Sequence, residues 1–324
     1  GCTHVIMEVS SHALTLDRVA GVHFAVGFFT NLTEDHLDFH KDMEDYFTSK
    51  LKIFTQSRIG CVNLDMDPVY MERTLAFAEQ NCEKTVTFGM EKVGDRKPDV
   101  YGISVDEKQG WLLLKAELFG KTEEFTVNIG GAYNAYNALA AIAVTASLGV
   151  PTEIIREGLE TVKVMGRMET YRLKDSVDVI VDYAHNKMSY QVLFDYVKKQ
   201  YPDRKVGFVF GCVGGKAFNR RKEAGEIAEK YADFVVITEL DPGMEDINKI
   251  CGEILSYIDH KEKAEIITDR DTAVYTALKK AEGMENCVLV LAGGSDAYMK
   301  RGNKVYPSDT DGERVQKFLK KIGK

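Results

Sequence analysis

Apolar and polar positions alternate in blocks along the first hundred residues. Short apolar runs at 4–9, 26–31, 61–64 and 85–88 predict β-strands, and a longer amphipathic stretch at 42–54 predicts a helix. Strands that alternate with helices usually form parallel βαβ units. The first part of the chain is therefore predicted to be an α/β domain.

The pattern then changes. Apolar residues recur at every second position over 99–128, between two polar turns, which predicts an antiparallel layer. An apolar helix is predicted over 134–150. An amphipathic helix is predicted over 152–162, with Thr152 as its cap and Glu153 in its first turn.

Beyond Gly166 a second cycle of apolar strands and amphipathic helices begins. The predicted strands are residues 177–185, 205–211, 233–240, 264–269 and 286–294. A sheet of this kind is doubly wound, with helices on both faces, and it binds ligands beyond the carboxyl ends of its strands. The sequence thus predicts two α/β domains, at 1–165 and 166–324.

Composition narrows the class of protein. The 324 residues are 44% hydrophobic, which is enough for two cores, and the formal net charge of −8 disfavours a nucleic-acid or anionic membrane surface. No apolar run is long enough to span a membrane. The six cysteines lack disulfide or zinc spacing, so reduced thiols in a cytoplasmic protein are expected. The chain begins on Gly1 within an apparent interior strand, which indicates the rear part of a longer protein.

Ionisable side chains gather in the first fifty residues, where five of the seven histidines occur. Glu8 lies at the carboxyl end of the predicted strand 4–9, and Asn31 ends the predicted strand 26–31. The carboxyl ends of parallel strands meet at one edge of a sheet, so these groups are expected to share a crevice. Carboxylates and imidazoles of this kind indicate a site for a cation or a phosphate.

Other motifs give weaker indications. His36, Asp38 and His40 have the residue types of a metallohydrolase site, but the segment that follows them looks helical. The GKT triplet at 120–122 lacks the earlier glycine of a P-loop and lies in a predicted hairpin.

Two loops of the second domain also carry candidate chemistry. The glycine-rich loop at 211–215 follows a strand and precedes Arg220 and Arg221, which suits a phosphate or a carboxylate but does not fit a dinucleotide fingerprint. Asp182 and His185 end another strand. Alone, this pair is as compatible with a helix cap as with a site.

Together these segments resemble the Mur ligases, and within that family the tripeptide synthetases. The resemblance covers nearly the whole chain. It rests on MEVSSHALTLDR, TNLTEDHLDFHKDMEDYFTSK, GGAYNAYNALAA, GRMET, VDYAH, the glycine loop after VFG, and TELDPGMED. It implies the family's central ATPase domain, a P-loop-type parallel sheet with a small antiparallel layer and without its first part. A Rossmann-like C-terminal domain would follow.

The resemblance also implies roles for individual residues. Glu8, His36 and Lys50 would be catalytic and would hold Mg²⁺, and Lys50 would be carbamylated by CO₂. The residues implied to face the UDP-muramoyl substrate are Ser10, His12 and Arg18. Those implied to bind ATP are Asn134, Asn137, Arg167, Asp182 and His185. Those implied to bind the incoming amino acid are Arg221, Asp241, Pro242 and Asp296.

The implied reaction is ATP-dependent amide formation. The glutamyl carboxylate of a UDP-N-acetylmuramoyl-dipeptide would attack the γ-phosphate of ATP, and the amine of a free amino acid would displace phosphate from the acyl phosphate. Positioning and charge neutralisation dominate such chemistry, so the lack of a Ser-His-Asp arrangement in the sequence is not surprising. The resemblance further implies a cytoplasmic monomer in peptidoglycan biosynthesis.

Departures from the family's pattern qualify these implications. The P-loop part is missing, so the 324 residues alone are not expected to turn over substrate. Asp241, Pro242, Gly243 and Met244 stand where diaminopimelate-adding members carry DNPR. Glycine removes a bidentate carboxylate clamp, which favours lysine over an amino acid with a second carboxylate. VLAGGSDAYMKRG replaces AGKGHEDYQ, which leaves the amino-acid specificity open.

Three alternatives stay open at this point. A related ligase could act on another carboxylate, such as a folylpolyglutamate, cyanophycin or a lipid-linked muramoyl substrate. A metallohydrolase could use His36, Asp38 and His40. A binding module without catalysis would fit a gene that truly begins at Gly1.

Overall fold

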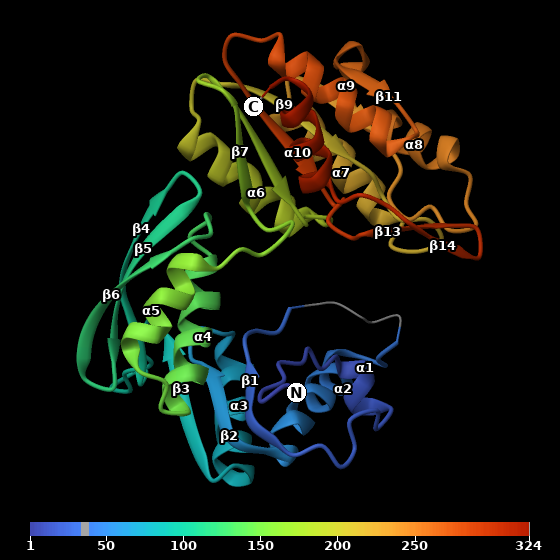
Figure 1. Ribbon diagram of the computed structural model, residues 1–324. Helices are drawn as coiled ribbons and strands as arrows, with labels where there is room; N and C mark the ends of the chain where they lie inside the picture. Colours follow the sequence, from blue (N-terminus) through green and yellow to red (C-terminus); the bar gives the residue numbers. More distant parts are fainter. Residues whose placement is uncertain (34–38, 324) are drawn as a thin grey trace. The chain divides into compact units, whose positions relative to one another are not determined.

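The computed structural model describes residues 1–33 and 39–323, which fold as two compact units (Figure 1). Unit 1 comprises Gly1–Glu107, Trp111–Asn128 and Ala132–Val162. Unit 2 comprises Lys108–Gly110, Ile129–Gly131 and Lys163–Lys324. No helix in the described part of the chain is long and apolar enough to cross a membrane.

Unit 1 is built on a six-stranded sheet of order β1-β2-β3-β4-β5-β6. The strands are β1 (Phe24–Phe29), β2 (Ser57–Asn63), β3 (Lys84–Gly89), β4 (Val100–Lys108), β5 (Trp111–Leu118) and β6 (Lys121–Val127). The first four are parallel and the last two are antiparallel to each other, which confirms a parallel sheet followed by an antiparallel layer.

Helices cover both faces of this sheet (Figure 1). They are α1 (Ser11–Thr15), α2 (Met43–Leu51), the 3-10 helix η1 (Lys52–Gln56), α3 (Pro68–Asn81), α4 (Asn134–Ser147) and α5 (Thr152–Thr161). Alternation along β2 sends Ile59 and Cys61 into the core shared with α4 and α5, whereas Val62 packs in the core shared with α1, α2 and α3.

The strand predicted at 4–9 is wrong. This segment has no regular secondary structure, and Val5 and Ile6 are 78% and 95% exposed. A strand is stable only when a neighbouring strand takes up its backbone N–H and C=O groups, and no described strand pairs with this segment. Apolar composition alone predicted a strand that has no partner here.

Unit 2 has a second six-stranded sheet, of order β11-β10-β9-β12-β8-β7. Its strands are β7 (Glu169–Lys174), β8 (Val177–Asp182), β9 (Lys205–Phe210), β10 (Phe234–Ile237), β11 (Ala264–Ile266) and β12 (Cys287–Ala292). All but β7 are parallel. The five predicted parallel strands are therefore confirmed.

The helices of unit 2 lie on both faces of its sheet, as in a doubly wound fold. They are α6 (Lys187–Gln200), α7 (Asn219–Tyr231), α8 (Ile247–Ser256), the 3-10 helix η2 (Lys261–Lys263), α9 (Arg270–Glu282) and α10 (Asp311–Lys321). Phe208 of β9 packs in the core with α6, α7 and α8, and the next residue, Val209, packs in the core with α9 and α10.

Three strands of unit 2 were not predicted: β7 and the hairpin formed by β13 (Tyr298–Arg301) and β14 (Lys304–Pro307). All four residues of β14 are exposed, and only Met299 is buried in β13. Strands without a buried face lack the apolar alternation on which the prediction depended.

Candidate functional site

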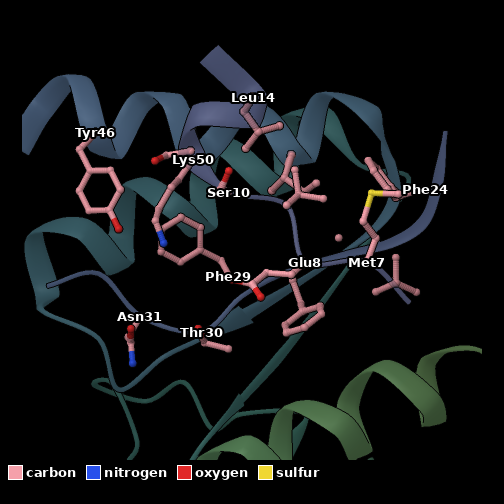
Figure 2. Close-up of a pocket in the computed structure, with 16 residues that line it drawn as sticks. Met7, Glu8, Ser10, Leu14, Phe24, Phe29, Thr30, Asn31, Tyr46 and Lys50 are labelled. Carbon is pink, nitrogen blue, oxygen red and sulfur yellow. The ribbon is translucent and has the colours of Figure 1, made fainter. Parts of the chain in front are cut away.

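A pocket of about 290 Å³ opens in unit 1 beside the carboxyl end of β1. Residues 7–11, β1 and helix α2 form its walls. Glu8, Ser10, Asn31 and Lys50 line it with polar side chains, and Figure 2 shows Glu8 and Lys50 reaching into it from different segments. These four residues, all of which the sequence singled out, thus lie at one pocket.

Lys50 is held by the helix that carries it and by two aromatic rings. Asp42 caps α2 by accepting the backbone N–H of Asp45, at 2.9 Å. From the last turn of α2, the Lys50 amine lies 5.5 Å from the ring centre of Phe29 and 5.1 Å from that of Tyr46. Ring faces favour the ammonium form by roughly 0.5–1 kcal/mol each at partly exposed sites.

The three residues expected at the UDP-muramoyl substrate begin α1 or follow it. Ser10 caps this short helix by accepting the backbone N–H of Ala13, at 3.2 Å. The ring of His12 lies 3.9 Å from that of Phe39, and Arg18 is exposed after the helix. Ser10 lines the pocket, whereas His12 and Arg18 are not among its lining residues.

A hydrogen-bonded row of Ser11, His40 and Asp45 lies beside this pocket. The Nε2 atom of His40 is 2.8 Å from Ser11 Oγ, and its Nδ1 atom is 3.3 Å from Asp45 Oδ2. The expectation that the chain has no Ser-His-Asp arrangement is therefore wrong. Ser11 and His40 are each only 2% exposed, so the row serves to join α1 to the first turn of α2.

The same contacts bear on the predicted metal sites. Both ring nitrogens of His40 already have protein partners, which argues against its use as a metal ligand. His36 and Asp38, the other two members of that motif, lie outside the described residues. Within the described residues, no three His, Cys, Asp or Glu side chains are grouped so as to hold a metal ion.

A second pocket, of about 210 Å³, lies in unit 2 at the carboxyl ends of its parallel strands. Loops after β8, β9, β10 and β12 line it, which is where a doubly wound sheet is expected to bind ligands. Its polar lining residues are Tyr183, His185, Lys216, Arg220, Asp241, Asp296, Tyr298 and Lys300.

Of the predicted ATP-binding residues in unit 2, Asp182 organises the backbone at the end of β8. Its carboxylate accepts the backbone N–H groups of Met168, at 3.0 Å, and Ala184, at 2.8 Å. Burial raises the pKa of this carboxyl. Asp182 thus fixes the backbone at Ala184 and at Met168, the residue after Arg167. Arg167 is exposed, and its guanidinium lies 4.5 Å from the ring centre of Tyr183.

His185 lines the unit 2 pocket. Its Nδ1 atom lies 2.9 Å from the carbonyl oxygen of Tyr183, so Nδ1 carries a proton that it donates to that carbonyl. Directly after it, Asn186 and Ser189 form a capping box that starts α6. The cap fixes the backbone from which the imidazole projects.

Asn134 and Asn137, the predicted adenine neighbours, share one face of α4. The Asn137 amide nitrogen donates to the Asn134 amide oxygen at 2.8 Å. Asn134 is buried at the start of this helix. The structure therefore brings the two amides together in unit 1.

The two adjacent arginines of α7 differ sharply. Arg221 is 1% exposed, and its guanidinium donates to Glu245, at 2.6 and 2.9 Å, and to Glu253, at 2.6 Å. This pairing lowers the pKa of Glu245 to about 2. The contacts of Arg221 do not support a role in binding a substrate carboxylate, whereas Arg220 lines the pocket.

The predicted amino-acid-binding residues Asp241 and Asp296 both line the unit 2 pocket, and Pro242 is buried directly behind Asp241. Asp241 has the uncommon backbone angle φ of +43°. Its carboxylate accepts the backbone N–H of Lys300 at 2.8 Å, and its own N–H lies 3.1 Å from the sulfur of Met299. Strand β13 therefore holds this loop in its unusual conformation.

Comparison with known proteins identifies both units. Residues 1–145 match the model of the Mur ligase middle domain, and residues 166–294 match that of the Mur ligase glutamate ligase domain. The chain belongs to the Mur ligase family. Both matched models belong to that family, and together they cover most of the chain.

Curated relatives of this Mur ligase chain are tripeptide synthetases. It is 34% identical to the UDP-N-acetylmuramoyl-L-alanyl-D-glutamate–2,6-diaminopimelate ligase of Caldanaerobacter subterraneus, over 98% of this chain and 64% of that protein. It is 31% identical to the corresponding L-lysine ligase of Enterococcus faecalis, over 99% of this chain and 63% of that protein. The chain thus spans less than two thirds of the length of these relatives.

Solved structures support the same fold. A 2,6-diaminopimelate ligase matches with a TM-score of 0.62 at 22% identity, over 97% of this chain and 64% of that one. Folylpolyglutamate synthase of Mycobacterium tuberculosis matches with a TM-score of 0.65 at 19% identity, over 83% and 61%. At these identities the matches establish the Mur ligase fold only.

Sequence reasoning missed several residues at the unit 2 pocket of this Mur ligase chain. Arg220 was named only as one of two basic residues behind the glycine loop, without a role of its own, and Lys216 and Lys300 were not singled out. The same glycine loop, which contains Lys216 in its continuation, could have indicated that lysine as well. Nothing in the sequence indicated Lys300, because it reaches the pocket from a hairpin that the apolar pattern did not predict.

Proposed function

We propose that this chain belongs to an ATP-dependent ligase that adds a diamino acid to UDP-N-acetylmuramoyl-L-alanyl-D-glutamate, the third residue of the peptidoglycan peptide. The observation that carries the proposal is the similarity to third-residue ligases along 98–99% of the chain. The grouping of Glu8, Ser10 and Lys50 at one pocket of unit 1 supports it. So does the polar pocket at the carboxyl edge of the unit 2 sheet.

The proposed reaction has two steps. A carboxylate oxygen of the substrate attacks the γ-phosphorus of ATP, ADP leaves, and an acyl phosphate forms. The amine of the amino acid then attacks the acyl carbon, inorganic phosphate leaves with the C–O bonding electrons, and the amine loses a proton. Such transfers depend on positioned cations rather than on a protein nucleophile. Arg167 of unit 2 is the proposed protein cation.

Mg²⁺ is the proposed metal partner of ATP, and it would supply neutralisation of phosphate charge. Glu8, with the Ser10 hydroxyl and the Asn31 amide at the same pocket, offers the oxygen donors that suit this ion. His36 is proposed as a further ligand on the resemblance alone. The residues proposed at ATP are Asn134, Asn137, Arg167, Asp182 and His185.

We further propose that Lys50 is carbamylated. Its neutral amine would attack CO₂ and lose a proton, leaving an anionic carbamate beside the cation site. Phe29 and Tyr46 favour the ammonium form, so the modification would depend on the metal to stabilise the negative charge.

The remaining proposals are that the enzyme is a cytoplasmic monomer, that Ser10, His12 and Arg18 face the UDP-muramoyl group, and that Asp241, Pro242 and Asp296 lie at the added amino acid.

Phosphate release by the full-length gene product tests the proposal. The assay contains MgATP, UDP-N-acetylmuramoyl-L-alanyl-D-glutamate and one candidate amino acid at a time. We expect phosphate release that requires all three substrates, with a tripeptide product detected by mass spectrometry. Release that is independent of the muramoyl substrate but dependent on a folate or another carboxylate would replace this function with that of a related ligase.

A further inference from the structure

Lys50 differs from most lysines in the surroundings of its amine. A lysine on a helix usually keeps its amine in water, and Lys52, two residues later, is exposed. Lys50 is half-buried and lines the unit 1 pocket, with its amine 5.1 Å from the ring centre of Tyr46 and 5.5 Å from that of Phe29. We name Phe29 and Tyr46 the ring pair.

Helix geometry brings Tyr46 to the lysine. The two residues are four positions apart on α2 and therefore lie on one face of the helix. A helical side chain leans towards the N-terminus of its own helix, which directs Lys50 over Tyr46. Tyr46 is 5% exposed, so its ring offers the lysine a surface that the core of unit 1 holds in place.

Phe29 reaches the lysine from the sheet. Alternation along β1 turns Phe29 into the core, whereas Phe28 is exposed. The ring centres of Phe47 and Phe54, both fully buried, lie 6.4 and 6.5 Å from that of Phe29. Aromatic contacts of this kind fix the orientation of a ring. The position of Phe29 is therefore determined by the core and not by Lys50.

Tyr46 has a support of its own. The ring of His40 lies 5.1 Å from that of Tyr46. His40 is held in turn by its hydrogen bonds with Ser11, at 2.8 Å, and Asp45, at 3.3 Å. The hydrogen-bonded row that joins α1 to α2 thus also lies behind the ring that faces the Lys50 amine.

We propose that Phe29 and Tyr46 are positioning residues for the ligase reaction, because they hold the Lys50 nitrogen at the pocket. Figure 2 shows this nitrogen close to both rings. The inference rests on the proposed function, in which Lys50 takes part. It goes beyond that function by assigning a role to two apolar rings that carry no chemistry of their own.

The place of the nitrogen matters because group transfer is sensitive to small displacements of the groups that assist it. A lysine side chain is flexible, and rings on two sides restrict it before any reactant binds. Such preorganisation removes the need to order the side chain during the reaction. The argument applies to the ammonium and to the proposed carbamate alike, so it does not depend on the modification.

Steady-state kinetics of the full-length gene product give the first test. In Tyr46→Leu and in Phe29→Leu, kcat should fall about a hundredfold, the loss that a displacement of about 1 Å can cause. The KM for the added amino acid should change less than about twofold, since the ring pair is not proposed to touch that substrate. The conservative variant Tyr46→Phe keeps the ring and should retain most of the parental kcat.

Phe88→Leu is the matched control for lost packing. Phe88 is fully buried in the other core of unit 1, which the sheet separates from the ring pair. This variant should keep kcat within about twofold of the parent, although its free energy of unfolding falls as in Tyr46→Leu. Urea denaturation compares the two stabilities. Equal losses of kcat in Phe88→Leu and Tyr46→Leu would overturn the inference.

Nuclear magnetic resonance gives a second test that needs no activity. The lysines are reductively methylated with ¹³C-formaldehyde, without nucleotide or metal, and Lys50→Arg identifies the signal of Lys50. Methyl groups over a ring face are shifted upfield, so this signal should lie upfield of those of exposed lysines. In Tyr46→Leu it should move towards them, and in Tyr46→Phe it should stay.

A parental Lys50 signal among those of exposed lysines would overturn the inference, and so would parental kcat in Tyr46→Leu. In both cases the proposed ligase function would stand. A parent protein that ligates no amino acid would instead remove the proposed function, and with it the reaction for which the ring pair is proposed.

Discussion

The pockets of the two units are held together by different forces. In unit 2, charged side chains tie down the loops around the sheet edge: Arg221 binds Glu245, and Arg301 binds Glu239 through both carboxylate oxygens. In unit 1, the segments beside the pocket are joined by the hydrogen bonds of Ser11, His40 and Asp45 and by the aromatic rings of Phe29 and Tyr46 next to Lys50. The comparison teaches that many charged residues of unit 2 hold loops in place, whereas Lys50 of unit 1 reaches a pocket.

The largest expected effect tests the Lys50 side of this comparison. Lys50→Ala in the full-length gene product should lower kcat about a thousandfold, because the carbamate proposed on this side chain, which would help to hold Mg²⁺, is lost. The control is Lys52→Ala, which removes an exposed lysine two residues later and should change kcat less than twofold. Both are measured by phosphate release. More than a tenth of the parental kcat in Lys50→Ala would show that this lysine serves only the fold.

Adding small anions to Lys50→Ala tests whether the lost activity depends on a negative charge at this position. If Lys50 acts as a carbamate, acetate or bicarbonate should restore part of the lost rate by supplying a carboxylate to the same pocket. An intact variant that neither anion activates would contradict the carbamate, though not the importance of the lysine.

A smaller effect, on stability, distinguishes the two arginines of α7. Arg221→Met should lower the free energy of unfolding by about 3 kcal/mol, because it leaves Glu245 and Glu253 without their shared partner. Arg220→Met should change it by less than about 0.5 kcal/mol. Urea denaturation followed by circular dichroism measures both. Equal losses of unfolding free energy in the two variants would show that Arg221 is no more important for the fold than Arg220.

Acid titration provides the control for this pair. The pKa of Glu245 is lowered from 4.5 to about 2, so its contribution to stability is fully present above pH 4.5 and is lost as the pH falls towards 2. The parent should therefore lose more stability than Arg221→Met over that interval. Parallel losses would show that Arg221 does not cause the shift.

The smallest effect concerns the hydrogen-bonded row in unit 1. Ser11→Ala removes the partner of His40 Nε2 and should cost about 1–2 kcal/mol of stability, since a buried ring nitrogen loses its hydrogen bond. The neighbouring Ser10→Ala removes only a cap of a short helix and should cost about 1 kcal/mol or less. Urea denaturation again gives both values. A greater loss of stability from Ser10→Ala would show that the buried hydrogen bond of Ser11 and His40 contributes less than the helix cap.

Much of the fold could be predicted from the chain. Buried parallel strands such as β9 and β12 are continuous apolar runs, and their order with the intervening helices determines a doubly wound unit. The prediction failed for residues 4–9, which are apolar but have no pairing partner, and for β13 and β14, which pair without a buried face. An apolar pattern predicts burial, but residues 4–9 are apolar and largely exposed, and β14 pairs with β13 while all its residues are exposed.

The candidate site divides in the same way. The sequence by itself marked Glu8 and His185 as candidate site residues, because polar groups at the ends of apolar runs stand out in the local pattern, and it marked Lys50 only through the family resemblance. Only the tertiary structure decided that Arg221 is buried against Glu245 while Arg220 lines a pocket, since one helical step of about 100° separates neighbouring side chains. Only folding, likewise, brought Lys300 and Lys304 beside Gly243, because pairing between segments far apart in sequence depends on backbone hydrogen bonds that no local pattern encodes.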